Sequence, residues 1–441
     1  MFETDVVVVG SGPGGATVAR ELARSGTRVL LLERGVDHRG RPWYGTHLGA
    51  MAYADRAGLR FTNEGMNVIR PLMVGGATAM YCGCAAPPPE WLKARYGIDL
   101  DQEVAATVDE LAVAPLPREL LGTASTQLAE AASSLGYPFE PQAKFLRPAR
   151  APRFDCNASC MLGCRCGAKW SAAEYVDDAV AAGAVLKTGA RVRQILVEDG
   201  RAIGVSVSAS GRAYDVRASR VVLAAGGLGT PGILRASGVS EAGDGLAMDV
   251  TAIVYGLGRV RGNGSDPPMT WSWEHAEQRI MLSTLVDPWL LYPVMAGLAN
   301  LGHVRHWLRW HRLLGVMVKL RDDVSGGLLA GGKITKRLSI ADRRRLAAGI
   351  ANAREILVAA GADPETVFTS PLRGTHPSAT ARIGRIVDRN LETEVEGLYV
   401  CDASVFPEAL GRPTVLTIVA LAKRLAAHLH GDRDRLASST A

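Results

Sequence analysis

The sequence has no long uninterrupted apolar run, no internal repeat and no low-complexity segment ahead of the short tail after Gly431. Its most apolar stretch, residues 289–301, is interrupted by Pro293 and Gly297 and is too short to span a bilayer. The excess of positive over negative charge is also small, because 50 basic side chains are balanced by 44 acidic ones and leave a net charge of +6. A nucleic-acid-binding protein would need basic side chains concentrated on one face beside stacking aromatics, so this composition argues against that class.

Cysteine is sparse, with 7 residues in 441, and no export signal accompanies it. The first strand-like run begins within the first few residues, which leaves no room for a signal peptide. Thiols without an export signal indicate a reducing compartment, so we expect a cytoplasmic protein rather than a disulfide framework. The length suggests two or three domains, and a hydrophobic content of 47% is ordinary for a soluble globular chain.

The feature around which the chain is organised is a β-α-β unit near its start. The run Val6–Val9 is typical of a strand buried on both faces. A glycine turn follows at residues 10–15, and a helix from about Ala16 leads to a second strand, Val29–Leu32. This order predicts a dinucleotide-binding unit with a pyrophosphate at the helix N-terminus. Glu33 ends the second strand, where a carboxylate accepts ribose hydroxyls, which favours FAD or NAD over NADP.

Later segments add further small-residue turns. Residues 35–70 are rich in Gly and Arg and are predicted to cross over the cofactor, and residues 74–83 form a second glycine turn that lets backbone approach a flat ring. Residues 221–225 and 397–404 are each typical of a buried strand that runs into a turn. A long apolar helix follows at about Pro413–His430. We therefore predict an α/β fold whose cofactor domain uses both ends and a middle segment of the chain.

The remaining regions differ in character. Residues 100–135 are alanine-rich and predicted to be helical, and residues 188–208 alternate around an Asp-Gly pair, which indicates a β-hairpin. Across residues 248–375, tryptophans and alternation replace the glycine turns, which predicts a substrate domain inserted into the cofactor fold. Within it, Ser339 and Asp342 are predicted to form a capping box at the start of a helix.

Together these motifs resemble those of the glucose–methanol–choline (GMC) oxidoreductases over nearly the whole chain, nearest the long-chain alcohol oxidases and the bacterial FAD-dependent sugar dehydrogenases. The resemblance rests on VVVGSGPGGA with LLERG, VGGATAMYCG, RVVLAAGGLGTPGIL, GTHPSATARIG and EGLYVCDASVFPEALGRPTVLTIVALAKRLA. It implies bound FAD, oxidation of a small-molecule alcohol by hydride transfer to the flavin, and an electron acceptor other than NAD, such as a protein or a quinone. Family members are longer as a rule, so we expect a trimmed substrate domain.

The resemblance also implies how the chain is divided. A discontinuous Rossmann-like FAD-binding domain would comprise residues 1–100, 180–247 and 385–441. Residues 101–179 would form a helical and cysteine-rich insertion, and residues 248–384 an α+β substrate domain on a mixed or antiparallel sheet. The residues expected to contact FAD are Gly10, Gly12, Gly14, Gly15, Glu33, Arg34, Gly75, Gly76, Ala77, Thr78, Val192, Ala225, Gly226, Asp402, Ala403, Pro413 and Thr414.

The family places a histidine over the flavin to take the hydroxyl proton, and His376 in GTHPSATARIG matches that position. A base with an unperturbed pKa of about 6.5 suits this step at neutral pH. Relatives usually carry His or Asn at a second catalytic position, where this chain has Pro413 beside Arg412. Proline offers no side-chain donor, so oxyanion stabilisation falls to Arg412 or to no residue. This departure leaves two alternatives open: a redox-neutral or desaturating flavoenzyme on the same fold, and a flavin-bearing electron-transfer subunit.

Four cysteines, Cys156, Cys160, Cys164 and Cys166, fall in one short span. Their spacing does not match a two-pair zinc site, and no histidine lies close by. Thiolates alone suit an iron–sulfur cluster, and CMLGCRCGAK resembles the cluster-binding stretch of the bacterial sugar dehydrogenases. Two interpretations remain: a cluster that relays electrons from the flavin, with Cys166 or Cys82 as the fourth ligand, and plain buried thiols.

One further stretch, residues 304–314, follows the apolar run 289–301 and mixes arginine with tryptophan at helical spacing. This pattern leaves two interpretations open. One is a substrate-domain helix packed over the active site, and the other is an interfacial helix in peripheral contact with a membrane or a partner.

Overall fold

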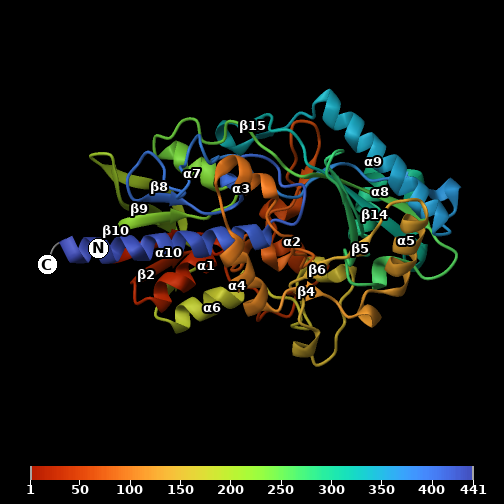
Figure 1. Ribbon diagram of the computed structural model, residues 1–441, viewed down its shortest axis with the longest axis horizontal. Helices are drawn as coiled ribbons and strands as arrows, with labels where there is room; N and C mark the ends of the chain where they lie inside the picture. The colour runs from red at the N-terminus through yellow and green to blue at the C-terminus, as the bar shows by residue number, and fades with distance from the viewer. Residues whose placement is uncertain (1, 440–441) are drawn as a thin grey trace.

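The computed structural model describes residues 2–439 and contains two large β-sheets side by side, with helices on their outer faces, besides two small two-stranded sheets (Figure 1). Both termini lie at the end of the molecule that carries the first sheet. The strand order of that sheet is β7 (Val185–Lys187), β2 (Val29–Leu32), β1 (Phe2–Val9), β10 (Arg212–Leu223), β9 (Arg201–Ala209) and β8 (Arg191–Glu198), with β19 (Leu398–Val400) also paired to β10.

Strand β1 is apolar on both faces because four consecutive valines, Val6–Val9, occupy it, and all four are buried. α1 (Pro13–Arg24) packs against both α6 (Ala172–Ala181) and α10 (Val415–Ser439) beside this sheet. α1 begins at Pro13 rather than near Ala16, because proline is favoured in the first turn, where a backbone N–H would have no helical partner. The predicted β-α-β unit is therefore present.

Strand β10 changes partners along its length. Its first half pairs antiparallel with β9, and its last residues pair in parallel with both β1 and β19. The ends of these three strands are in register, since Leu223 pairs with Val9 and with Val400. In an open α/β sheet, ligands bind beyond the carboxyl ends of parallel strands, so this register predicts where the cofactor lies.

The predicted hairpin in residues 188–208 is formed by β8 and β9. Asp199 and Gly200 make the turn, and both have positive φ, 48° and 78°. A two-residue type I′ turn requires left-handed conformations at both positions, which is why an Asp-Gly pair is a dependable hairpin signal.

The second sheet is mixed at its edge and antiparallel at its centre. The two central strands are β11 (Val250–Leu257) and β14 (Leu313–Leu320), and every residue in each of them is buried. α9 (Ile340–Ala359) covers one face of the sheet (Figure 1). The predicted α/β fold with an inserted, mixed-sheet substrate region is thus confirmed. The strand order is β3 (Asn67–Val68), β18 (Arg373–Gly374), β11 (Val250–Leu257), β14 (Leu313–Leu320), β13 (Ile280–Thr284), β12 (Trp271–His275) and β5 (Glu140–Pro141), with β17 (Phe368–Thr369) on β11.

Short elements complete the description. β3 and β5 join the second sheet although they lie within residues 1–100 and 101–179, and the domain boundaries stay predictions. No helix among residues 2–439 is long and apolar enough to cross a membrane. The other elements are α2 (His47–Tyr53), α3 (Glu90–Tyr96), α4 (Asp101–Leu111), β4 (Ala114–Pro115), α5 (Thr123–Ser134), β6 (Ala143–Lys144), α7 (Thr230–Ala236), α8 (Leu291–Ala299), β15 (Gly327–Leu328) and β16 (Ile334–Thr335).

Two local expectations are corrected. The helical region predicted for residues 100–135 is two helices, because Pro115 and Pro117 interrupt it between α4 and α5. At the start of α9, Ser339 Oγ accepts a hydrogen bond from Asp342 N, as a capping residue should. The carboxylate of Asp342, however, accepts from Asp323 N, so the predicted capping box is only half formed.

Candidate active site

A cavity of about 780 Å³ lies at the carboxyl ends of β1, β10 and β19. Its walls come from the turns after these strands, from the start of α1 and from the segment around His376. Four residues predicted to contact the cofactor do not line the cavity, although each is next to a lining residue in the chain. They are Gly15, Gly75, Thr78 and Pro413. The predicted cofactor residues that line the cavity are Gly10, Gly12, Gly14, Glu33, Arg34, Gly76, Ala77, Val192, Ala225, Gly226, Asp402, Ala403 and Thr414.

The glycines at the start of α1 show which position faces a ligand. A Cβ on Gly14 would lie 1.9 Å from the carbonyl oxygen of Cys401, and one on Gly15 would lie 1.9 Å from that of Gly10. A Cβ on Gly12, in contrast, would meet no atom within 4 Å. Gly12 is also the N-cap of α1, and no side chain caps this helix, so the first amides are left for a ligand. The residues therefore fit the pyrophosphate of FAD.

Glu33 is buried in the cavity wall at the end of β2. Its Oε2 accepts hydrogen bonds from Ser11 N at 2.9 Å and Ser11 Oγ at 2.6 Å, and its Oε1 accepts one from Gly35 N at 2.7 Å. Each carboxylate oxygen has two acceptor positions, so Oε1 keeps one for a ribose hydroxyl. The sequence alone did not single out Ser11, because its role is to hold the side chain of Glu33, which lies at the end of the next strand.

Asp402 and Gly226, which were assigned separately to the cofactor, are bonded to each other. Asp402 Oδ2 accepts hydrogen bonds from Gly226 N at 2.8 Å and from Thr230 Oγ1 at 2.5 Å, and Oδ1 accepts one from Ser404 N at 2.8 Å. Asp402 thereby ties the turn after β19 to the turn after β10. Both turns line the cavity, so this carboxylate shapes its wall.

The largest group missed from the sequence is a set of arginines in the cavity wall. Asp55 lies between two of them, 3.5 Å from Arg60 and 3.8 Å from Arg70. Burial lowers the pKa of Arg70 to about 10, which leaves it protonated at neutral pH. The Gly- and Arg-rich composition of residues 35–70 was the available signal. Positive side chains suit the anionic diphosphate of the cofactor, and the missed arginines are Arg56, Arg60, Arg70, Arg191 and Arg193.

His376 lines the same cavity and is held by a buried carboxylate. Its Nδ1 lies 2.7 Å from Oδ2 of Asp249, whose side chain is 1% exposed. Oδ1 of Asp249 accepts a hydrogen bond from Gly411 N at 2.8 Å. The His376 backbone N–H donates to the Met248 carbonyl at 2.9 Å, so both backbone and ring of this residue are bound to the two residues just before β11.

The surroundings of His376 determine its protonation. Burial and the nearby Lys319 ammonium lower the pKa of His376, and Asp249 partly opposes them. The imidazole is therefore neutral at pH 7. Because a carboxylate can only accept, the proton of the neutral ring lies on Nδ1, and Nε2 is left as a proton acceptor. Lys319 itself is buried and its Nζ donates to Thr375 Oγ1 at 2.8 Å, directly beside His376 in the chain.

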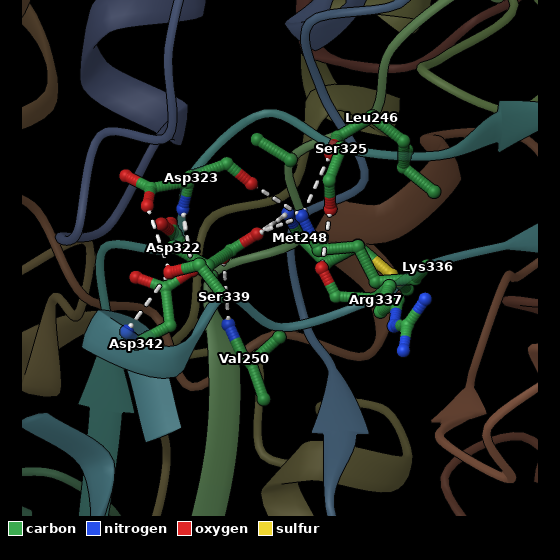
Figure 2. A network of polar contacts seen from close by, with 12 residues as sticks. Leu246, Met248, Val250, Asp322, Asp323, Ser325, Lys336, Arg337, Ser339 and Asp342 are labelled. Carbon is green, nitrogen blue, oxygen red and sulfur yellow. Dashed lines mark hydrogen bonds and ion pairs between the residues drawn. The ribbon is translucent and has the colours of Figure 1, made fainter. Parts of the chain in front are cut away.

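A buried ion pair supports the backbone on both sides of Asp249 (Figure 2). Lys336 Nζ lies 2.6 Å from Asp322 Oδ2, and both side chains are fully buried. The Asp322 carboxylate also accepts hydrogen bonds from Met248 N and Val250 N, at 3.2 and 3.1 Å. Asp249 between them has φ of 47°, a conformation that side-chain-bearing residues adopt rarely. The ion pair thus holds Asp249 in a strained position from which it reaches His376.

The segment after His376 packs closely against the turns that follow β10 and β19. A Cβ on Gly227, in the turn after β10, would lie only 2.0 Å from the Pro377 carbonyl oxygen. Farther along, Ala381 N donates to Ser404 O at 2.8 Å, next to the turn after β19. Backbone contacts therefore set the position of His376 relative to the cavity.

Arg412 points away from these groups. Its Nη2 lies 2.6 Å from Oε1 of Glu274 on β12, and its Nη1 donates to the Pro87 carbonyl at 3.3 Å. Neither Arg412 nor Pro413 lines the cavity. The catalytic role assigned to Arg412 stays a prediction without a supporting contact.

The four clustered cysteines form two pairs. The Sγ atoms of Cys164 and Cys166 are 3.8 Å apart, and Cys156 is hydrogen-bonded to Cys160, whose pKa this bond lowers to about 6. The ammonium of Lys169 lies among them and donates to the Cys160 carbonyl at 2.7 Å. In the described part of the chain, no three His, Cys, Asp or Glu side chains are arranged to hold a metal ion. This arrangement of side chains does not fit an iron–sulfur cluster, which was one of the two interpretations left open by the sequence.

Comparison with solved structures shows the fold. Pyridoxine 4-oxidase from Mesorbium loti superposes with a TM-score of 0.72 at 17% identity, covering 97% of this chain and 99% of that protein. A formate oxidase variant from Aspergillus oryzae gives a TM-score of 0.70 at 15% identity, covering 99% of both chains.

Comparison by sequence gives the family. The N-terminal GMC oxidoreductase model matches residues 55–253 and the C-terminal one residues 333–422, while a Thi4 family model matches residues 1–64. An uncharacterised GMC-type oxidoreductase of Mycobacterium tuberculosis is 29% identical over 96% of this chain and 75% of its own length. A long-chain-alcohol oxidase of Arabidopsis thaliana is 25% identical over 94% of this chain and 65% of its own length, so the chain spans about two thirds of that relative. The chain belongs to the GMC oxidoreductase family and is an FAD-dependent oxidoreductase that acts on the CH–OH group of its donor.

Proposed function

We propose that this chain oxidises an alcohol with His376 as the base, and that the electrons leave to a protein or a quinone rather than to NAD. When bound, FAD supplies the hydride acceptor, and the protein supplies the base, the orientation and the surroundings. The observation that carries the proposal is that His376 lines a cavity that fits FAD and is held from behind by the buried Asp249 carboxylate. The alcohol oxidases among the relatives support the substrate class.

The proton step follows from the hydrogen bonds of His376. Nε2 accepts the hydroxyl proton of the substrate, because Nδ1 already donates to Asp249. The imidazolium that forms then lies 2.7 Å from a buried carboxylate, which stabilises its charge. A positioned general base of this kind is worth about 10²–10⁴-fold in rate.

We assign stabilisation of the developing alkoxide to Lys319 rather than to Arg412. Arg412 is paired with Glu274, and Pro413 has no side-chain donor. Lys319 is buried, and its Nζ reaches Thr375 beside His376. Burial lowers the pKa of Lys319, and the Asp249 carboxylate partly opposes this. The positive potential of Lys319 favours an anionic oxygen near His376 and opposes protonation of His376 before the substrate binds. We propose no route for the electrons through the cysteines, since the arrangement of their thiols does not fit a cluster.

The test is anaerobic stopped-flow mixing of the FAD-loaded protein with a panel of primary and secondary alcohols. We expect a substrate to bleach the oxidised flavin, and His376→Ala to slow bleaching by about 10²–10⁴-fold with FAD still bound. His311→Ala is the matched control, because His311 is exposed and lies outside the cavity. If His376→Ala bleaches the flavin at the wild-type rate, this histidine is not the base.

The same experiment separates the alternatives. A redox-neutral or desaturating flavoenzyme would show no bleaching by any alcohol although dithionite reduces its flavin. A flavin-bearing electron-transfer subunit would be reduced by a protein donor and not by alcohols. Either result would contradict the proposed function while leaving the FAD site intact.

A further inference from the structure

The structure exposes a group of large apolar side chains on one connected segment. The segment begins at Trp289, just before α8, and continues through α8 and the 3-10 turns of Leu301–Arg312. Leu301 is 80% exposed and Leu308 is 86% exposed, which is unusual for leucine in a folded domain. The exposed apolar residues of this segment are Trp289, Leu290, Val294, Leu298, Leu301 and Leu308.

This segment folds back on itself as a hairpin. The rings of Trp289 and Trp307 are 4.8 Å apart, and the Trp310 indole donates to the Asp287 carbonyl at 3.0 Å. The inner face is anchored by the buried side chains of Tyr292 and Met295. Core packing therefore accounts for the inner face only, and the outer leucines contribute nothing to it.

The apolar surface continues onto α2. The Leu290 backbone N–H donates to His47 Nε2 at 3.2 Å, which joins the start of the hairpin to the start of α2. Leu48 and Met51 on α2 are also exposed. We refer to residues 289–312 together with Leu48 and Met51 as the apolar face.

The charge of the apolar face has one sign. Residues 289–312 contain no Asp or Glu, although the chain has 44 acidic residues among 441. Arg305, Arg309 and His311 of this segment are exposed. A surface that combines exposed Leu and Trp with cations is complementary to anionic headgroups above an acyl layer. A two-fold dimer through the same face would bring these cations together, so it fits a second copy poorly.

We propose that the apolar face docks onto the surface of an anionic phospholipid bilayer. The leucines enter the headgroup region, and Arg305 and Arg309 lie at the level of the phosphates. The contact is peripheral and reversible. Docking does not depend on the proposed alcohol oxidation, although a hydrophobic alcohol or a quinone would partition into the same bilayer.

The experiment is co-sedimentation of the full-length, FAD-loaded protein with vesicles. We expect binding to vesicles of phosphatidylglycerol and phosphatidylcholine, about tenfold weaker binding to phosphatidylcholine alone, and weakening by salt. The double variant Leu301→Glu/Leu308→Glu should lose at least about tenfold in vesicle affinity, and Arg305→Gln/Arg309→Gln should lose the preference for anionic vesicles. Ile340→Glu is the matched control, since Ile340 is a 73% exposed apolar residue at the start of α9.

Flavin content and circular dichroism establish that each variant is folded. The proposal is overturned if the wild type does not bind anionic vesicles, or if the leucine double variant binds them as well as Ile340→Glu does. It is equally overturned if sedimentation equilibrium shows a dimer that the leucine substitutions dissociate, because the face would then be covered by a second copy.

Discussion

Asp249 and His376 are separated by 127 residues in the chain, and their side chains meet at 2.7 Å. Asp249 stands just before β11, and His376 follows β18, which pairs with β11. The pairing of these two strands thus brings the carboxylate to the imidazole. Their bond fixes which ring nitrogen is free to take a proton, so its removal has a defined kinetic signature.

Asp249→Asn should lower the rate of flavin reduction at pH 7 by about 10²–10³-fold, because the imidazolium loses its buried counter-charge. Asp249 raises the pKa of His376, so its loss lowers that pKa further. His376 acts as a base only when it is neutral, so the rate of flavin reduction falls at acidic pH. In the variant this fall should occur at a lower pH, and the maximal rate at higher pH should be smaller. Reductive half-reactions measured across pH test this, and a fall at the wild-type pH would contradict it.

Lys319→Met should move this fall in rate in the opposite direction. Lys319 lowers the pKa of His376, so its removal raises that pKa, and a higher pH is needed to keep the base neutral. The maximal rate should also fall if the ammonium stabilises the alkoxide. The control is Lys333→Met, at an exposed lysine outside the cavity. If the rate of flavin reduction depends on pH in the same way in both variants, Lys319 does not act on His376.

Gly12→Val should abolish FAD binding without unfolding the protein. Gly12 has φ of −67°, which any residue tolerates, and a Cβ there meets no protein atom. The valine would instead occupy the space predicted for the pyrophosphate. Flavin content after gel filtration, with circular dichroism as the folding check, measures the effect. Gly40→Ala, also in open space, should keep its flavin, and a flavin-replete Gly12→Val protein would contradict the assignment.

Lys336→Met should lower the free energy of unfolding by about 3–5 kcal/mol, because it leaves the buried Asp322 without its partner. Denaturant unfolding followed by tryptophan fluorescence measures this difference. Lys333→Met, which alters an exposed lysine nearby, should change stability by less than about 0.5 kcal/mol. Similar losses in the two variants would mean that the pair in Figure 2 does not support the fold.

The parts of the fold that the sequence predicts well depend on local patterns. Val6–Val9 forms a buried strand because four adjacent apolar β-branched residues suit a strand with two covered faces. The hairpin at Asp199 follows from a pair of residues that accept positive φ. Several predicted cofactor residues line the cavity because they lie in the turns that follow strands, as Gly10, Glu33, Ala225 and Asp402 do.

The parts that sequence reasoning missed depend on distant partners. Asp249 has no neighbouring signal, because its importance comes from His376 and from the Lys336–Asp322 pair. Lys319 looks like an ordinary strand residue until the sheet brings it to Thr375. The four clustered cysteines left two interpretations open, and in the described part of the chain their thiols are not arranged to hold a metal ion.

The tight contact between Gly227 and the Pro377 carbonyl has a consequence for how this enzyme can diversify. It is a contact between backbones, so it fixes the spacing between base and cofactor whatever side chains surround them. Substitutions of the side chains around the cavity can then change its shape without altering that spacing. A GMC enzyme built in this way can acquire a new alcohol through its side chains and retain its reaction by leaving a single glycine untouched.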